Sequence, residues 1–134
     1  MNRLKGRIIK KELSGGICRV EVKVKEHVFA AILLEDQHFS PHLKEGREVT
    51  LLFKETEVCL AKGLSGSISL SNRIASVIEE IIESNILTRV VMNDQGQKTA
   101  AVITTASAKR MDLKVGQTVE WLVKANEIIL SLEV

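Results

Sequence analysis

The sequence has few of the features that mark the commonest functional classes. Its 134 residues include no tyrosine, one tryptophan and three phenylalanines, too few aromatic faces for a protein that stacks single-stranded bases. The net charge of +2 is also small for a nucleic-acid binder. No apolar run reaches the roughly 18 residues that span a bilayer, and the first residues lack the apolar core of a signal peptide. We therefore expect a folded cytoplasmic protein, with neither nucleic acid nor a membrane as partner.

Reactive and metal-binding motifs are scarce as well. The two cysteines, Cys18 and Cys59, lie in alternating apolar segments without a CxxC spacing, so we expect two buried free thiols. Asp36, His38 and His42 share one predicted turn, but their spacing matches no metal-ligand pattern. The sequence contains no GxSxG, HExxH or Walker A motif. These absences argue against an enzyme and against a metal site.

The strongest positive signal is an internal repeat. When the chain is shifted by 70 residues, residues 1–64 align with residues 71–134 without a gap. Asn2-Arg3 then falls on Asn72-Arg73, and the motif LKEG falls on LKVG. A short segment containing Gly and Ser separates the two copies. We therefore divide the chain into a first repeat over 1–62, a linker over 63–68 and a second repeat over 69–134.

Each repeat is predicted to form five strands with a short helical turn after the third. In the first repeat these strands cover 3–13, 16–24, 27–34, 47–54 and 57–61. Residues 72–85 alone have helical spacing, but the matching segment carries Gly6 in mid-run and both segments continue into β-branched runs, so we predict strands. This order is typical of a small OB-type barrel. The expected fold class is all-β with short helical turns, as two tandem OB-like five-stranded barrels that pack on each other because each is marginal alone.

Three hydroxyl residues, Thr104, Thr105 and Ser107, follow the predicted third strand of the second repeat. Such residues often cap a following helix, and hydroxyl donors at that position can also hold an anion, so the residues alone leave both readings open. Lys124 and its repeat counterpart Lys54 follow the fourth strands. They could extend into solvent or offset the charge of a bound oxyanion. The polar run 67–73 is typical of a linker that leads into a strand.

The second repeat resembles the Mop, or molybdate-binding TOBE, domain, and the whole chain resembles the di-Mop molbindins. The matching motifs are SLSN at 69–72, AVITTAS at 101–107, LKVGQTV at 113–119 and VKANEI at 123–128. The resemblance implies an OB-like barrel that binds molybdate or tungstate without an organic cofactor, in a homo-oligomer for which a trimer is favoured. The oxyanion ligands that it implies are Ser69, Ser71, Asn72, Arg73, Thr104, Ser107, Lys124 and the amide of Ala125.

The chain departs from the family pattern in both repeats. The family often has an arginine where this chain has Ser71, and Arg73 would point to the same side of a strand. Thr105, between the two proposed ligands, is expected to be a plain helix cap. In the first repeat, carboxylates flank the aligned positions, so its site is interpreted as degenerate, with three residues as possible secondary ligands: Asn2, Arg3 and Lys54.

The function that we expect is binding of molybdate or tungstate for molybdenum storage or homeostasis. The alternative is a regulatory or assembly TOBE module that acts through a protein partner and has a weakened or lost oxyanion site.

Overall fold

The computed structural model describes residues 1–132 of the chain, and within them ten strands, one α-helix and three short 3₁₀ turns alternate. The first repeat forms β1 (Asn2–Ser14), β2 (Ile17–Val24), β3 (His27–Leu34), η1 (Ser40–His42), β4 (Glu48–Phe53), η2 (Glu55–Glu57) and β5 (Cys59–Ala61). The second forms β6 (Asn72–Glu83), β7 (Leu87–Asp94), β8 (Gln97–Thr104), α1 (Thr105–Arg110), β9 (Thr118–Val123), η3 (Ala125–Glu127) and β10 (Ile129–Leu132).

The two repeats have the same secondary structure, as the sequence predicts. Residues 72–83 form a strand despite their helical spacing, and a short helix follows the third strand in both repeats. Both long first strands also carry a β-bulge at the same repeat position, after Ile8 and after Ile78. A bulge increases the local twist and bends a strand, which lets a long strand curve around a small barrel. The expected all-β fold class is confirmed.

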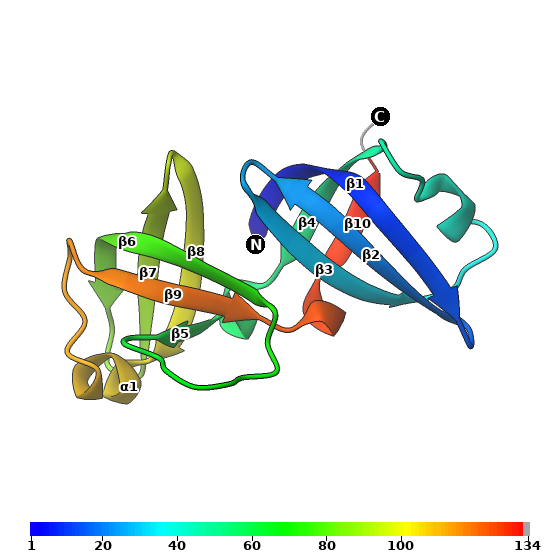
Figure 1. Cartoon of the computed structure of the whole chain (residues 1–134). Helices are drawn as coiled ribbons and strands as arrows, with labels where there is room; N and C mark the ends of the chain where they lie inside the picture. The colour runs from blue at the N-terminus through cyan, green and yellow to red at the C-terminus, as the bar shows by residue number, and fades with distance from the viewer. Residues whose placement is uncertain (133–134) are drawn as a thin grey trace.

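The two folded bodies do not coincide with the two sequence repeats. One sheet has the order β10-β4-β1-β2-β3 and the other has the order β5-β9-β6-β7-β8. The last strand of each repeat therefore pairs in the sheet of the other repeat: Leu130 lies opposite Leu51, and Leu60 lies opposite Trp121. Figure 1 shows this exchange, with β10 in the body that contains β1–β4, and β5 in the body that contains β6–β9. The fifth strand of the first repeat, predicted over 57–61, is shorter in the structure, because β5 covers only Cys59–Ala61 and Glu57 belongs to the 3₁₀ turn η2.

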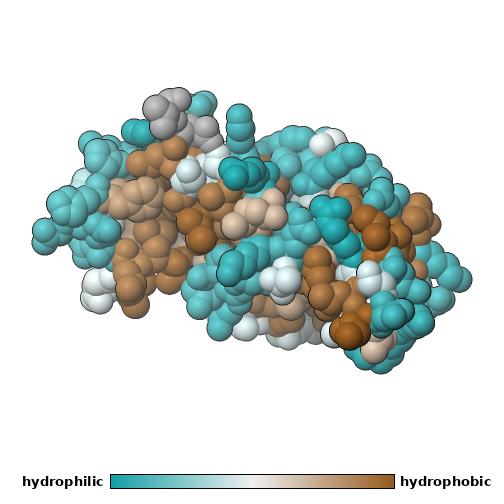
Figure 2. Space-filling model, turned by 180° about the vertical axis from the view of Figure 1, so that it is seen from behind, coloured by the Kyte–Doolittle hydropathy of each residue, from teal (hydrophilic) through white to brown (hydrophobic). Residues whose placement is uncertain are grey.

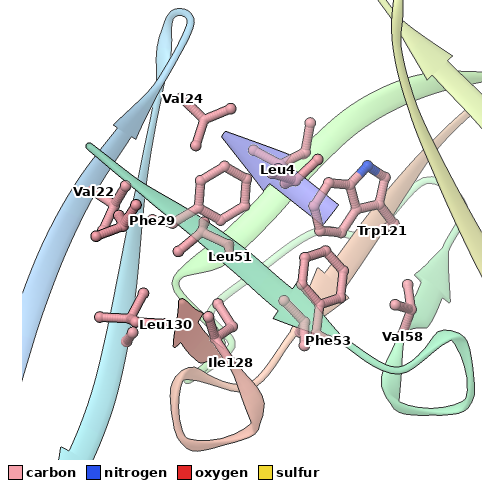
Figure 3. Close-up of a cluster of buried hydrophobic side chains, with 14 of the residues drawn as sticks. Leu4, Val22, Val24, Phe29, Leu51, Phe53, Val58, Trp121, Ile128 and Leu130 are labelled. Carbon is pink, nitrogen blue, oxygen red and sulfur yellow. The ribbon is translucent and has the colours of Figure 1, made fainter. Parts of the chain in front are cut away.

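One hydrophobic core runs through both bodies. The ring of Trp121 on β9 stacks against Phe53 on β4 at 5.5 Å and lies 5.8 Å from Phe29 on β3. Figure 3 shows these rings with Leu4 and Val58 in the same cluster. Three of the four aromatic residues of the chain therefore join one repeat to the other. Burying them together compensates for the small core of each barrel, as the sequence leads us to expect.

The burial of the cysteines agrees only in part with the sequence analysis. Both thiols are free, and Cys18 is buried, but Cys59 is exposed. The prediction that Cys59 is buried is wrong because β5 is a three-residue strand at the edge of its sheet, where an alternating side chain can face outward. No helix within residues 1–132 is long and apolar enough to cross a membrane.

Candidate functional site

The polar residues at the start of β6 meet the end of β9 in the structure. Asn72, the first residue of β6, lies opposite Val123, the last residue of β9. Lys124 and Ala125 follow at once, with Lys124 exposed and Ala125 at the start of η3. Ser69 and Ser71 are exposed immediately before β6. The structure thus brings together six of the predicted ligands, which we call the opening group: Ser69, Ser71, Asn72, Arg73, Lys124 and Ala125.

Within the opening group, Asn72 has a structural role. Its side chain is 1% exposed, and its Nδ2 donates to the carbonyls of Ala30 at 2.9 Å and Val123 at 3.1 Å. Its Oδ1 accepts from the Ala30 N–H at 2.8 Å. Because Nδ2 carries two hydrogens and both are used, Asn72 has no donor left for an anion. The prediction of Asn72 as a ligand is therefore corrected to a clamp between the repeats.

Asn2 makes the reciprocal clamp in the first repeat. Its Nδ2 donates to the Ala100 carbonyl at 2.9 Å, and its Oδ1 accepts from the Ala100 N–H at 2.8 Å. Ala30 and Ala100 lie on β3 and β8, which are edge strands of their sheets. The two carboxamides therefore satisfy backbone groups that an edge strand would leave unpaired. Asn2 is likewise removed from the predicted secondary ligands.

Arg73 is the second residue of the opening group with a partner inside the chain. Its Nε and Nη2 donate to the two carboxylate oxygens of Glu120 at 2.5 and 2.9 Å. These hydrogen bonds lower the pKa of Glu120 and raise that of Arg73. The bidentate pair neutralises the guanidinium, so Arg73 does not supply the positive charge expected of it. Its repeat counterpart Arg3 is exposed.

Thr104 and Thr105, at the end of β8, have different roles from those that the sequence predicts. Thr104 is the N-cap of α1: its Oγ1 accepts from the Ser107 N–H at 3.1 Å and donates to Ser107 Oγ at 2.9 Å. Thr105, predicted as the plain cap, is 5% exposed, and its hydroxyl lies 2.8 Å from that of Thr88 and donates to the Ser84 carbonyl at 2.7 Å. The prediction for Thr105 is wrong by one residue, because the strand continues to Thr104 and turns Thr105 inward.

Thr104 and Ser107 lie in a groove of about 480 Å³ that both repeats build. We call it the hydroxyl groove. One side comes from β8 and α1, with Thr104, Ser107 and Arg110, and the other from η2 and β5, with Thr56 and Cys59. Most of the remaining lining is apolar, so these hydroxyls and the guanidinium are its polar part. The structure therefore places the hydroxyls beside the turn that follows Lys54.

Lys124 lies elsewhere in the chain. It precedes η3, which packs against β3, whereas η2 packs against β8. This arrangement is a direct result of the strand exchange. The sequence-based grouping of Thr104 and Ser107 with Lys124 is thus corrected: within one chain, the lysine at the corresponding place is Lys54.

A second groove occupies the matching position in the other body. Its lining is mostly apolar and includes Ile17, Leu34 and Phe39 from the first repeat with Ile129 and Leu130 from β10. Leu34 stands where the second repeat has Thr104 and is 78% exposed. Figure 2 shows a large hydrophobic area on the body with β3 and β10, which lies on the left in that view. We call this the apolar groove; its lining offers few hydrogen-bond donors to an oxyanion.

The turn after β3 holds the residues weighed above as metal ligands. Asp36 Oδ1 accepts from the His38 backbone N–H at 2.7 Å, and the Asp36 N–H donates to Ser40 Oγ at 2.8 Å. These bonds shape the turn in the manner of an Asx motif. Among residues 1–132, no three His, Cys, Asp or Glu side chains gather closely enough to hold a metal ion.

The two turns that carry the chain between the bodies meet through their acidic residues. Glu57 on η2 and Glu127 on η3 occupy the same repeat position, and their carboxyls are hydrogen-bonded. This hydrogen bond raises the pKa of Glu127, and partial burial acts in the same direction. On η2, Glu55 instead pairs with Arg89 at 2.7 Å, and that hydrogen bond lowers the pKa of Glu55. The junction therefore combines the exposed side chains of Lys54 and Lys124 with one carboxyl group whose pKa is lowered, Glu55, and one whose pKa is raised, Glu127.

Two residues of the hydroxyl groove were missed in the sequence analysis. Thr56 comes from the first repeat, and only the strand exchange brings it near Thr104. Arg110 lies three residues after Ser107 on α1 and donates from Nη2 to Ser107 Oγ at 3.1 Å. A helical i,i+3 spacing places two side chains on the same face, so Arg110 could have been found from the sequence. No comparable signal exists for Thr56.

Comparisons with known proteins agree with the sequence resemblance. The TOBE domain family matches residues 68–130. The molybdenum-pterin-binding protein MopB of Rhodobacter capsulatus is 35% identical over 92 residues, which are 67% of this chain and 34% of that protein. The chain thus spans about a third of the length of this relative.

Solved structures give a further comparison. A structure of the cytoplasmic molybdate-binding protein ModG, with molybdate bound, matches with a TM-score of 0.93 at 21% identity. The match covers 98% of this chain and 96% of that one, and it establishes that the two folds are the same. A molybdate-binding protein from Sporomusa ovata is 33% identical over 52% of this chain and 97% of its own, with a TM-score of 0.45.

Proposed function

We propose that this chain is a protein of the di-Mop molbindin type and that it binds molybdate or tungstate, since its second repeat matches the TOBE domain family. Binding would serve molybdenum storage or homeostasis in the cytoplasm, without catalysis. Two relatives support the ligand, because MopB is described as molybdenum-pterin-binding and the ModG structure holds molybdate. The observation that carries the proposal for this chain is the hydroxyl groove, where Thr104 and Ser107 face a turn from the other repeat.

The chemistry of the groove suits a tetrahedral dianion. Such an ion leaving water must regain its hydrogen bonds from several donors at once. Ser107 Oγ accepts from both Thr104 and Arg110, which leaves its own hydrogen free to be donated. Thr56 adds a hydroxyl from the opposite side. Lys54, exposed at the N-cap of η2, adds positive charge to the turn that supplies Thr56.

We propose a second, incomplete site at the opening group. Ser69, Ser71, Lys124 and the amide of Ala125 lie together there, but the neighbouring first-repeat surface carries Leu34 instead of a hydroxyl. A neighbouring chain would have to complete this site. Exposed apolar side chains such as Leu34 and Ile86, 78% and 76% exposed, also favour self-association. We therefore propose a homo-oligomer, with a trimer favoured, which light scattering would detect.

Calorimetric titration with molybdate, tungstate and sulfate tests the proposed function. The wild-type protein should bind the first two at micromolar concentrations or below, and complete absence of heat from both would refute the proposal. We expect the hydroxyl groove to be the tighter of the two sites, and Lys54→Ala should weaken binding there, because η2 packs against β8 beside this groove. Lys124→Ala should leave that site unchanged and reduce only the site at the opening group. Equal effects of the two substitutions on the tighter site would contradict this assignment of the lysines.

The alternative function is a regulatory or assembly module that acts through a protein partner. The apolar groove favours it, since ten residues line this groove and most of them are apolar. A stable complex with a defined partner, formed by a protein that fails to bind either oxyanion, would support the alternative. Loss of that complex in a Leu34→Glu variant would assign it to the apolar groove.

A further inference from the structure

Arg110 is the cationic side chain of the hydroxyl groove. It is the last residue of α1 and lines the groove together with Thr104 and Ser107. Its Nη2 donates to Ser107 Oγ at 3.1 Å, the same atom that accepts from Thr104 Oγ1 at 2.9 Å. Two hydrogen bonds from different directions thus fix the orientation of the Ser107 hydroxyl. α1 has only six residues, so these side chains, rather than the helix end, define the feature.

The charge of Arg110 is not neutralised by a carboxylate. Among the ion pairs within residues 1–132, four other arginines each contact a glutamate: Arg7, Arg19, Arg73 and Arg89. Arg110 is absent from these pairs and contacts a hydroxyl instead. A guanidinium has five N–H donors in a planar fork, so one bond to Ser107 leaves others for a ligand. The groove therefore holds an available positive charge at its hydroxyl side.

The first repeat shows that this cation and the hydroxyls occur together. The residue that corresponds to Arg110 is Ser40, which is 3% exposed and accepts a hydrogen bond from the Asp36 N–H. The residues that correspond to Thr104 and Ser107 are Leu34 and Gln37. The groove without hydroxyls thus also lacks the arginine. A cation retained only beside the hydroxyls suits a ligand-binding role better than a general role in ending the helix.

We propose that Arg110 is an oxyanion-binding residue of the hydroxyl groove, where its guanidinium supplies positive charge beside the hydroxyls. This inference rests on the proposed function and assigns a residue to that same site. Ser107 would donate one hydrogen bond, and Arg110 would add charge-assisted bonds to neighbouring oxygens of the ion. Because hydroxyls recognise shape and the guanidinium recognises charge, Arg110 would make the groove prefer a dianion to a monoanion of the same shape.

Paired titrations with molybdate and perrhenate, a tetrahedral dianion and a tetrahedral monoanion, test this role. Arg110→Met removes the charge and keeps much of the apolar stem, and Arg110→Lys restores the charge without the planar fork. Lys109→Met is the matched control, because Lys109 is an exposed cation of the same last turn that does not line the groove. We expect Arg110→Met to weaken molybdate binding by about tenfold to a hundredfold, the range for a lost charge-assisted hydrogen bond.

The pattern across ligands and variants separates the possible outcomes. Perrhenate binding should change by less than about threefold in Arg110→Met, and Arg110→Lys should recover part of the molybdate affinity. If Arg110→Met and Lys109→Met bind molybdate alike, or if Arg110→Met loses both ions equally together with thermal stability, the role of Arg110 is refuted while the proposed function stands. If the wild-type protein binds neither molybdate nor tungstate, the proposed function itself fails.

Discussion

Replacement of Asn72 by alanine should be among the most damaging polar substitutions in this protein. The change removes three hydrogen bonds from a side chain that is 1% exposed. It leaves the Ala30 N–H without an acceptor and the carbonyls of Ala30 and Val123 without this donor. An unsatisfied buried backbone group costs about 1–3 kcal/mol, and we expect Asn72→Ala to lower the free energy of unfolding by about 3 kcal/mol.

The reciprocal clamp supplies an internal scale for this value. Asn2 makes two hydrogen bonds where Asn72 makes three, the extra one going to Val123 at 3.1 Å. Asn2→Ala should therefore cost about 1 kcal/mol less than Asn72→Ala, the net value of one hydrogen bond. Asn85→Ala, at an exposed position outside the clamps, is the matched control and should stay within about 0.5 kcal/mol of the wild type.

Urea denaturation followed by the fluorescence of the single tryptophan measures these differences. Trp121 contacts aromatic rings of the other repeat, so its emission reports the core that the clamps hold together. Each substitution should shift the midpoint without changing the slope, in a single transition. If Asn2→Ala lowers the free energy of unfolding more than Asn72→Ala does, or if both variants match Asn85→Ala, the number of clamp hydrogen bonds does not determine the stability of the variants.

Three further predictions concern packing, a buried hydrogen bond and pH. Gly6→Ala should destabilise by about 1–3 kcal/mol, because its Cβ would lie 2.6 Å from Val22 Cγ1, and chemical denaturation would measure the loss. Ser76→Ala at the same repeat position removes the acceptor 3.2 Å from the Trp121 indole nitrogen and should cost about 1 kcal/mol. A larger loss from Ser76→Ala than from Gly6→Ala would contradict the role of close packing. The lowered pKa of Glu55 adds stability that is present at neutral pH and lost as the pH falls through that lowered value. Glu55→Gln should therefore flatten the acid limb of a stability–pH curve below about pH 4, and an unchanged limb would refute the contribution of its arginine pair.

The sequence was sufficient to predict what each repeat contains. Strands, the helix after β8 and the relation between the repeats all follow from apolar alternation and a constant shift. The helical spacing of 72–83 did not mislead, because the matching segment carries Gly6, which in the structure lies close to Val22. Comparison between copies resolves ambiguities that one copy alone would leave.

What the sequence could not predict is which repeat each fifth strand joins. An alternating segment such as Cys59–Ala61 has the same pattern in either sheet, so nothing local reveals the exchange. The misassigned residues follow from that gap. Asn72 was predicted as a ligand from the SLSN motif, because nothing in the local sequence reveals that its side chain is bonded to Ala30 of the other repeat. Lys124 was grouped with the wrong hydroxyls because η3 packs on the other body.

The exchange of the last strands makes the linker between the repeats redundant for holding them together. A break in the backbone within 63–68 would leave one piece with β5 in the sheet of the other piece, and a second piece with β10 in the sheet of the first. Each piece would then contribute one strand to the sheet of the other, and the two pieces would stay associated without a covalent bond between them. The same geometry would allow two separate single-repeat chains to assemble by strand exchange. The linker therefore contributes a higher effective concentration of one repeat near the other, and the exchanged strands form the association itself.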